Sequence, residues 1–301
     1  MNNVCTYLVH LFKLGISSGS LNSIRSALSF FTQNSSLDLG NNPMVARCFK
    51  SFYKMRPNFP RYVVTWDVGI VLRFLASWHP PEELSLKQLT LKTVTLIALT
   101  ASDRAQTIHC IDIDHMHFGS KGLECHIPAL LKHSRRGKPA RTVLCVEWDA
   151  PELDVCNYVQ IYLRKTFKFR LKAVRLGKKK PTQLFLSHRT GKPVERASIS
   201  RWIREVLGLS GIDITTFSAH STRGASASAA ARCGASPQQI MKQGDWSNLG
   251  TYQRFYDRVP DDTPVGRLIL SSQCKFCLVP LIYYFLLSLL NFLTLIYLSL
   301  P

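Results

Sequence analysis

A histidine and an arginine stand three residues apart in the segment AHSTRGASASAAARCG, immediately before a run of alanine and serine. If this segment is a helix, His220 and Arg223 belong to its first turn, where free backbone N–H groups and the helix dipole favour an anion. The small side chains that follow let such a helix pack closely against its neighbours. The pair therefore either caps the helix or faces a negatively charged ligand, and the segment alone leaves both readings open.

Other side chains with suitable chemistry are spread along the chain. Arg104 lies in the apolar segment LIALTASDRAQTI, where a lone arginine is costly unless it meets a partner. Lys132 stands where a predicted strand meets a basic hairpin tip. Trp246 follows a glycine that closes a short predicted helix, and Tyr256 ends the segment TYQRFY, with Tyr252 one helical turn before it.

The order Arg, Lys, His-x-x-Arg, Trp, Tyr resembles that of the tyrosine recombinases, the superfamily of phage integrases and Cre-like enzymes. The segments RYVVTWDVGIVLRFL, TASDRAQTI, FSAHSTRGASASAA and DWSNLGTYQRFYDR are most similar to recombinases of DIRS-like retrotransposons, and the resemblance covers roughly residues 1–260. It implies a mobile-element recombinase or integrase that cleaves and rejoins double-stranded DNA through a 3′-phosphotyrosine intermediate. It also implies a homo-tetramer on paired DNA sites, with no metal ion, no ATP and no cofactor.

Within this resemblance, Tyr256 is the expected nucleophile and Tyr252 is the alternative. A tyrosine has a pKa of about 10, so ionising it at pH 7 costs about 4 kcal/mol. A base within reach removes much of that cost, and His220 is the best candidate for this base.

The remaining members of the set are expected to bind the phosphate and the leaving group. Arg104 and Arg223 would bind the non-bridging oxygens, where charge builds up in the transition state. Lys132 would protonate the leaving 5′-oxygen, with Lys138 as the alternative. Trp246 would offer its indole N–H to the phosphate and an apolar wall behind the tyrosine.

The chain is strongly basic, with 38 Lys and Arg residues against 19 Asp and Glu residues and a formal net charge of +19. Such a charge attracts a polyanion at long range; nucleic acid is the first candidate and an anionic membrane surface the second. Nine Lys and Arg residues lie within residues 164–180. This run is as consistent with a solvated face or a nuclear-import signal as it is with binding to a polyanion. The protein is expected in the nucleus or elsewhere inside the cell. The residues expected to contact DNA are Arg135, Arg136, Lys138, Arg141, Lys178, Lys179, Lys180 and Arg201.

Hydrophobic periodicity predicts a mainly α fold with a small antiparallel β-sheet (α+β). Residues 1–60 are expected to form a helical core-binding (SAM-like) DNA-binding domain, shorter than is usual in the family, and residues 61–262 the tyrosine recombinase catalytic domain. One helix is predicted over residues 90–111, and two strands over 123–131 and 140–148, joined by the basic tip KHSRRGKP. The segment SPQQIMKQG carries the serine, proline and glutamine of a capped short helix.

The C-terminal segment 274–301 does not fit a recombinase. Residues 278–300 contain no charge, and as a helix they would span about 34 Å, enough to cross a bilayer. This hydrophobic tail is a membrane anchor, a helix exchanged between subunits, or a segment appended by a gene model, so membrane contact is expected only through it. The pair CKFC within the tail has zinc-knuckle spacing but no second pair near it, and no metal site is expected. Two rival functions remain: a non-catalytic DNA-binding remnant and a tail-anchored membrane protein.

Overall fold

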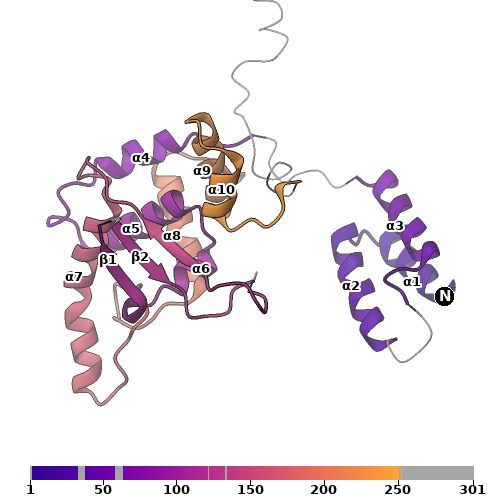
Figure 1. The fold of residues 1–301 in the computed structure, drawn as a ribbon, viewed down its shortest axis with the longest axis horizontal. Helices are drawn as coiled ribbons and strands as arrows, with labels where there is room; N and C mark the ends of the chain where they lie inside the picture. Colours follow the sequence, from indigo (N-terminus) through magenta and orange to yellow (C-terminus); the bar gives the residue numbers. More distant parts are fainter. Residues whose placement is uncertain are drawn as a thin grey trace, which may run out of the picture. The chain divides into compact units, whose positions relative to one another are not determined.

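A computed structural model describes residues 2–32, 38–57, 64–120, 122–132, 134–250 and 252 of the 301-residue chain. Contacts divide the chain into two units, Met1–Arg61 and Tyr62–Pro301 (Figure 1). The described residues are mostly helical and include a three-stranded antiparallel sheet, so the predicted fold class is confirmed.

The first unit is a set of helices around a small apolar core. Its helices are α1 (Asn2–Lys13), α2 (Ser18–Phe31) and α3 (Pro43–Met55). Ser17 caps α2 by accepting a hydrogen bond from the backbone N–H of Ser20, and Asn42 caps α3 in the same way. The rings of Phe12 and Phe52 stack at 4.4 Å between centroids and hold α1 against α3.

The second unit combines its sheet with α-helices of 5 to 21 residues. In chain order its elements are α4 (Val68–Ala76), α5 (Leu86–Ala101), α6 (Ala105–His109), the 3₁₀ helix η1 (Ile113–His115), β1 (Met116–Gly119), β2 (Gly122–His126), β3 (Thr142–Cys145), α7 (Val155–Arg175), α8 (Arg196–Leu209), α9 (Ser221–Arg232) and α10 (Pro237–Gly244). The sheet order is β1-β2-β3, and Met116 pairs with Cys125 while Cys125 pairs with Val143.

Helix α5 is the centre of this unit. It is buried over most of its length and packs against α7, α8, α9 and β3. Its buried Lys92 donates hydrogen bonds from Nζ to the carbonyl oxygen of Trp78 at 2.6 Å and to the hydroxyl of Tyr158 at 2.7 Å. These contacts satisfy a charged group that the apolar surroundings would otherwise exclude.

Two predicted elements are corrected by the structure. The helix predicted over 90–111 is wrong: it breaks at Ser102, whose φ of 52° is left-handed, and α6 begins again at Ala105. The strand predicted over 123–131 ends at His126, because Pro128 has no N–H to continue the ladder. Strand β1 was not predicted.

The tail is not part of the described structure. Residues 274–301 lie outside the described residues, as does the pair CKFC. Among the helices that are described, none is both long enough and apolar enough to span a bilayer.

Candidate active site

The first turn of α9 contains a buried arginine. Arg223 is fully buried, and its Nη2 donates a hydrogen bond to the carbonyl oxygen of Gly244 at 2.5 Å. Its guanidinium carbon lies 4.4 Å from the centroid of a ring of Trp246. The structure thus brings Arg223 and Trp246, two of the expected site residues, into contact.

His220 stands at the N-cap position of α9, but its side chain makes no capping hydrogen bond, and the residue is exposed. The helix start is instead fixed from outside: Trp66 Nε1 donates to the hydroxyl of Ser221 at 2.9 Å. The histidine is therefore at the surface of the same helix end that buries Arg223, and the capping reading of the pair is not supported.

Arg104 lies at the start of a helix rather than inside one, which corrects its predicted setting. It is the N-cap residue of α6, half-buried, and its side chain has no hydrogen-bond or ion-pair partner among the described residues. The left-handed turn at Ser102 directs the chain into this position. Ending α5 there places the guanidinium at a helix terminus instead of within the apolar core.

Asp103 links the two arginine-bearing segments. It is 3% exposed, and Arg141 donates to its Oδ2 from Nη2 at 2.7 Å and from Nε at 3.3 Å. Burial raises the pKa of this carboxyl, while the positive charges of Arg141 and Arg223 act in the opposite direction. Arg104 directly follows Asp103, so this carboxylate precedes α6 and lies within electrostatic reach of Arg223 in the first turn of α9.

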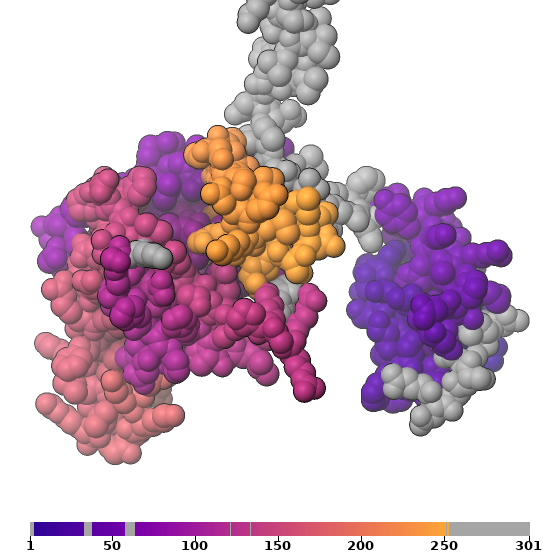
Figure 2. All heavy atoms as spheres, in the orientation of Figure 1, coloured from indigo at the N-terminus to yellow at the C-terminus, as the bar shows by residue number. Residues whose placement is uncertain are grey.

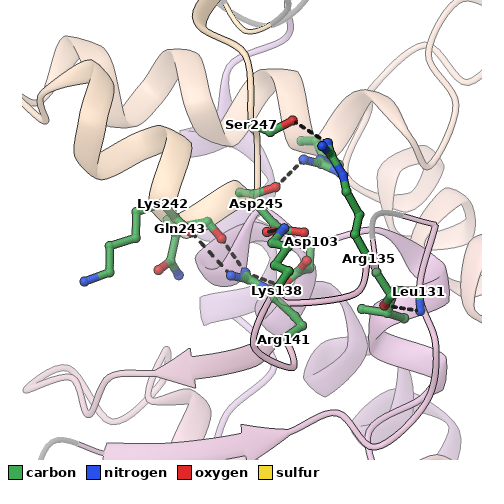
Figure 3. A network of polar contacts seen from close by, with 12 residues as sticks. Asp103, Leu131, Arg135, Lys138, Arg141, Lys242, Gln243, Asp245 and Ser247 are labelled. Carbon is green, nitrogen blue, oxygen red and sulfur yellow. Dashed lines mark hydrogen bonds and ion pairs between the residues drawn. The ribbon is translucent and has the colours of Figure 1, made fainter.

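The loop between β2 and β3 is fastened to the end of α10, as Figure 3 shows. Arg141 donates to the carbonyl oxygens of Lys242, at 3.3 Å, and Gln243. Lys138 Nζ lies 2.5 Å from Asp245 Oδ1. Figure 2 shows this loop projecting from the second unit beside the orange segment of α9 and α10.

A further contact completes this fastening: Arg135 Nη2 donates to the hydroxyl of Ser247 at 3.4 Å. The backbone that presents Trp246 is therefore held on both sides by basic side chains of the loop. Here Arg135, Lys138 and Arg141, all predicted to contact DNA, have protein partners. Sequence reasoning missed this role, although an aspartate in the apolar segment TASDRA is a signal that a cation must lie nearby.

Lys132 belongs to this loop and not to a strand, which corrects its predicted place. It is exposed and makes no hydrogen bond or ion pair with a described residue, and the same is true of Arg136. The structure does not bring Lys132 into contact with Arg104, His220 or Arg223.

Tyr252 and Trp246 pack in one apolar cluster with Ala227 and Ile240. Tyr252 is 1% exposed, and its ring lies 5.6 Å from that of Trp246 between centroids. Tyr256 lies outside the described residues, so its role stays a prediction.

The remaining basic residues lie elsewhere on the second unit. Lys178, Lys179 and Lys180 are exposed and follow α7, whereas Arg201 is exposed on α8 and donates to the hydroxyl of Ser198 at 3.0 Å. Their contact with DNA stays a prediction. Among the described residues, no group of three or more His, Cys, Asp or Glu side chains is arranged to hold a metal ion.

Residues 78–261 match the Phage integrase family, and this match covers more than half of the chain. The chain therefore belongs to the phage integrase family, the tyrosine recombinases. No curated protein sequence gave a significant match.

Solved structures with the same fold include integrases bound to DNA. The Tn1549 transposon integrase (residues 82–397) in complex with circular intermediate DNA has a TM-score of 0.52 and 12% identity, covering 87% of this chain and 82% of that chain. A lambda integrase(75–356) dimer bound to a COC′ core site has a TM-score of 0.51 and 14% identity, with coverage of 87% and 82%. A lambda integrase tetramer bound to a Holliday junction has a TM-score of 0.51 and 14% identity, with coverage of 88% and 67%. At these identities the likeness establishes the fold.

Proposed function

We propose that this protein is a tyrosine recombinase that breaks and rejoins double-stranded DNA through a covalent 3′-phosphotyrosine intermediate. The observation that carries the proposal is the buried Arg223 at the start of α9, packed on Trp246 and adjoining the Asp103–Arg104 segment, in a chain of the phage integrase family. A guanidinium held at a helix N-terminus suits a phosphate, because the fixed donors and the helix dipole act on the same anion.

In the proposed reaction, the phenolic oxygen of Tyr256 attacks phosphorus, a P–O bond to the tyrosine forms, and the P–O5′ bond breaks. His220 takes the phenol proton, and Lys132 gives a proton to the 5′-oxygen. The energy of the broken phosphodiester bond is retained in the phosphotyrosine ester. The reverse attack by a 5′-hydroxyl therefore rejoins a strand without an external energy source.

The phosphate itself would be held by Arg104 and Arg223 as negative charge develops on its oxygens. Loss of one such donor typically lowers the rate by ~100- to 1000-fold. Lys138 is the weaker candidate for the acid because its amino group already pairs with Asp245. The burial of Tyr252 against Trp246 likewise favours Tyr256 as the nucleophile.

The proposal extends to the biological setting. The sequence segments similar to DIRS-like recombinases support a mobile-element origin, and we infer action in the nucleus or elsewhere inside the cell as a homo-tetramer on paired sites. Similar folds have been solved as a dimer on a core site and as a tetramer on a Holliday junction, which supports assembly on DNA.

The test is covalent capture on a library of nicked suicide duplexes with randomised cores, because the target site is unknown. Protein-bound DNA that resists denaturation and phenol extraction is recovered and sequenced. We expect an adduct with the full chain, its loss in Tyr256→Phe and its retention in Tyr252→Phe. Retention of the adduct in Tyr256→Phe, together with its loss in Tyr252→Phe, would identify Tyr252 as the nucleophile. Gel-shift binding of the full chain without any adduct would instead indicate a non-catalytic remnant.

A further inference from the structure

A cationic groove of about 740 Å³ lies at the C-terminal end of α7 and shares no lining residue with the candidate active site. Figure 1 shows α7 extending past the sheet before the chain turns back. The groove is lined by Lys and Arg side chains and contains no carboxylate among its lining residues. We call it the α7 groove, and its cations are Lys172, Lys178, Lys179, Lys180, Arg189 and Lys192.

The walls of the α7 groove are fixed by buried interactions. Arg170 is 3% exposed and donates to the carbonyl oxygens of Pro181, Gln183 and Leu184 at 2.5, 3.0 and 2.8 Å. Three hydrogen bonds from this one guanidinium group thus hold the returning backbone, which is why Arg170 is not available to a ligand.

The opposite wall lies directly on an aromatic ring. Gly191 has φ +67°, and a Cβ at this position would come within 2.5 Å of the Phe169 ring. The loop is closed by a hydrogen bond from the N–H of Ser187 to the carbonyl oxygen of Lys192 at 2.8 Å. This part of the α7 groove is therefore apolar and closely packed, and the cationic side chains surround it.

The six cations of the α7 groove are unneutralised. None of their side-chain nitrogens forms an ion pair or hydrogen bond with any residue that the structure describes. Some basic side chains elsewhere in the second unit are paired, such as Lys87 with Glu205 at 2.6 Å. Six like charges around one groove repel each other, and a polyanion that displaces their counter-ions relieves this repulsion.

The composition of the groove points to phosphate groups. Five of its six cations are lysines, which bind phosphate as point charges and do not need the fixed two-point geometry of an arginine fork. Contacts of this kind position a duplex without reading its sequence.

We propose that the α7 groove is an accessory site for the phosphate backbone of double-stranded DNA outside the segment that is cleaved. This inference rests on the proposed function, because DNA is the polyanion that the candidate active site would bring to the second unit. It assigns a sequence-independent contact to a surface that shares no residue with the candidate active site.

The test is the salt dependence of equilibrium binding to a long labelled duplex, measured with the full chain by fluorescence anisotropy. Lys178→Gln, Lys179→Gln and Lys180→Gln are combined in one variant. The matched control combines Arg164→Gln, Lys168→Gln and Arg175→Gln, which are exposed on α7, remove the same charge and do not line the groove.

Each phosphate contact contributes about 0.9 to the slope of log K against log salt. We expect the slope to fall by about 2.7 in the groove variant and by less than 1 in the control. A second variant on the opposite wall, Arg189→Gln with Lys192→Gln, is expected to lower it by about 1.8. These exposed substitutions leave the buried Arg170 contacts in place, and unfolding midpoints check that each variant is folded.

Equal slopes for the groove variants and the control would overturn the inference. Tighter binding of polyglutamate than of duplex DNA, lost in the groove variants, would overturn it in favour of an acidic protein segment. Failure of the proposed function is read separately, as the absence of any covalent adduct with the unsubstituted chain. That result is independent of the slopes.

Discussion

The carboxylate of Asp103 lies beside the guanidinium groups of Arg141 and Arg223 in a part of the molecule that excludes water. Burial of an ion pair is costly, and its attraction repays that cost only when the remaining donors are satisfied. Arg141 meets this condition by donating to two carbonyl oxygens at the end of α10 as well. The pair therefore serves as an anchor between α6 and α10.

Removing one partner of this pair is expected to be strongly destabilising. Asp103→Ala leaves the Arg141 charge buried without its carboxylate, and we expect the free energy of unfolding to fall by about 3–5 kcal/mol. The double variant Asp103→Leu with Arg141→Met should recover most of that loss. Urea unfolding of Asp103→Leu, Arg141→Met and the double variant measures the coupling, and strictly additive losses would contradict the anchor.

Lys92 gives the protein a pH-dependent stability. Burial lowers the pKa of Lys92 to about 8, from 10.5 in the unfolded chain. Below pH 8 both states carry the proton and the cost of burying the charge is fully present. Between about pH 8 and 10.5 only the unfolded state holds the proton, so stability rises with pH.

We therefore expect the unfolding free energy of the unsubstituted protein, relative to Lys92→Met, to increase by on the order of 2 kcal/mol between pH 8 and pH 10. The difference between the two proteins removes the effects of other groups that titrate in this range. Burial raises the pKa of Tyr158 to about 12. In the folded state this neighbour of Lys92 therefore keeps its proton between pH 8 and pH 10. Denaturant unfolding at intermediate pH values measures the trend, and a flat difference would contradict it.

At the scale of elements, the end of α10 is shaped by a close approach. A Cβ on Gly244 would lie 1.9 Å from Cζ3 of Trp246, so only glycine fits while the indole keeps its place. We expect Gly244→Ala to displace Trp246 and to lower the unfolding free energy by about 1–3 kcal/mol. Urea unfolding and tryptophan fluorescence measure the two effects.

Gly208 in α8 provides the matched control, because a Cβ there would meet Ile214 at an ordinary 3.4 Å. Gly208→Ala should stabilise the helix by about 0.5–1 kcal/mol. If Gly244→Ala proves as stable as the unsubstituted protein, with unchanged fluorescence, the close approach does not constrain the helix end.

Locally determined elements were predictable from the sequence. The capped helix in SPQQIMKQG is confirmed. The hydroxyl of Ser236 accepts a hydrogen bond from the N–H of Gln239, and the side-chain oxygen of Gln239 accepts one from the N–H of Ser236. Pro237 occupies the first turn. The break at Ser102 was not predictable, because serine carries no strong signal for a left-handed residue and the apolar pattern continues on both sides.

The candidate site likewise has a part that could be predicted from the sequence and a part that could not. The order of Arg, Lys, His-x-x-Arg and Trp could be recognised along the chain, and the structure joins Arg223 with Trp246. The pairing of Asp103 with Arg141 depends on a loop and a strand register between residues 38 positions apart, which no local pattern encodes.

At the scale of the whole molecule, the residues that match the family end before the hydrophobic tail. The match stops at residue 261, while the uncharged stretch begins at residue 278. We expect a chain ending at residue 273 to form the covalent DNA adduct at the rate of the full chain. The capture assay described above compares the two.

Loss of the adduct in the shortened chain would contradict this expectation and would indicate a helix exchanged between subunits. Association with lipid vesicles that resists carbonate, seen for the full chain and absent from the shortened one, would identify the tail as a membrane anchor. An unchanged adduct with no such association indicates that the tail is dispensable for the chemistry.

The fastening of the β2–β3 loop to the end of α10 has a mechanical consequence. Lys132 and Trp246 are carried by segments joined at three points, through Arg135, Lys138 and Arg141. A ligand that draws the loop toward itself must either break these joints or pull the indole along. The positions of Lys132, the proposed proton donor, and Trp246, the wall behind the nucleophile, are thus coupled. A displacement of one segment is transmitted to the other.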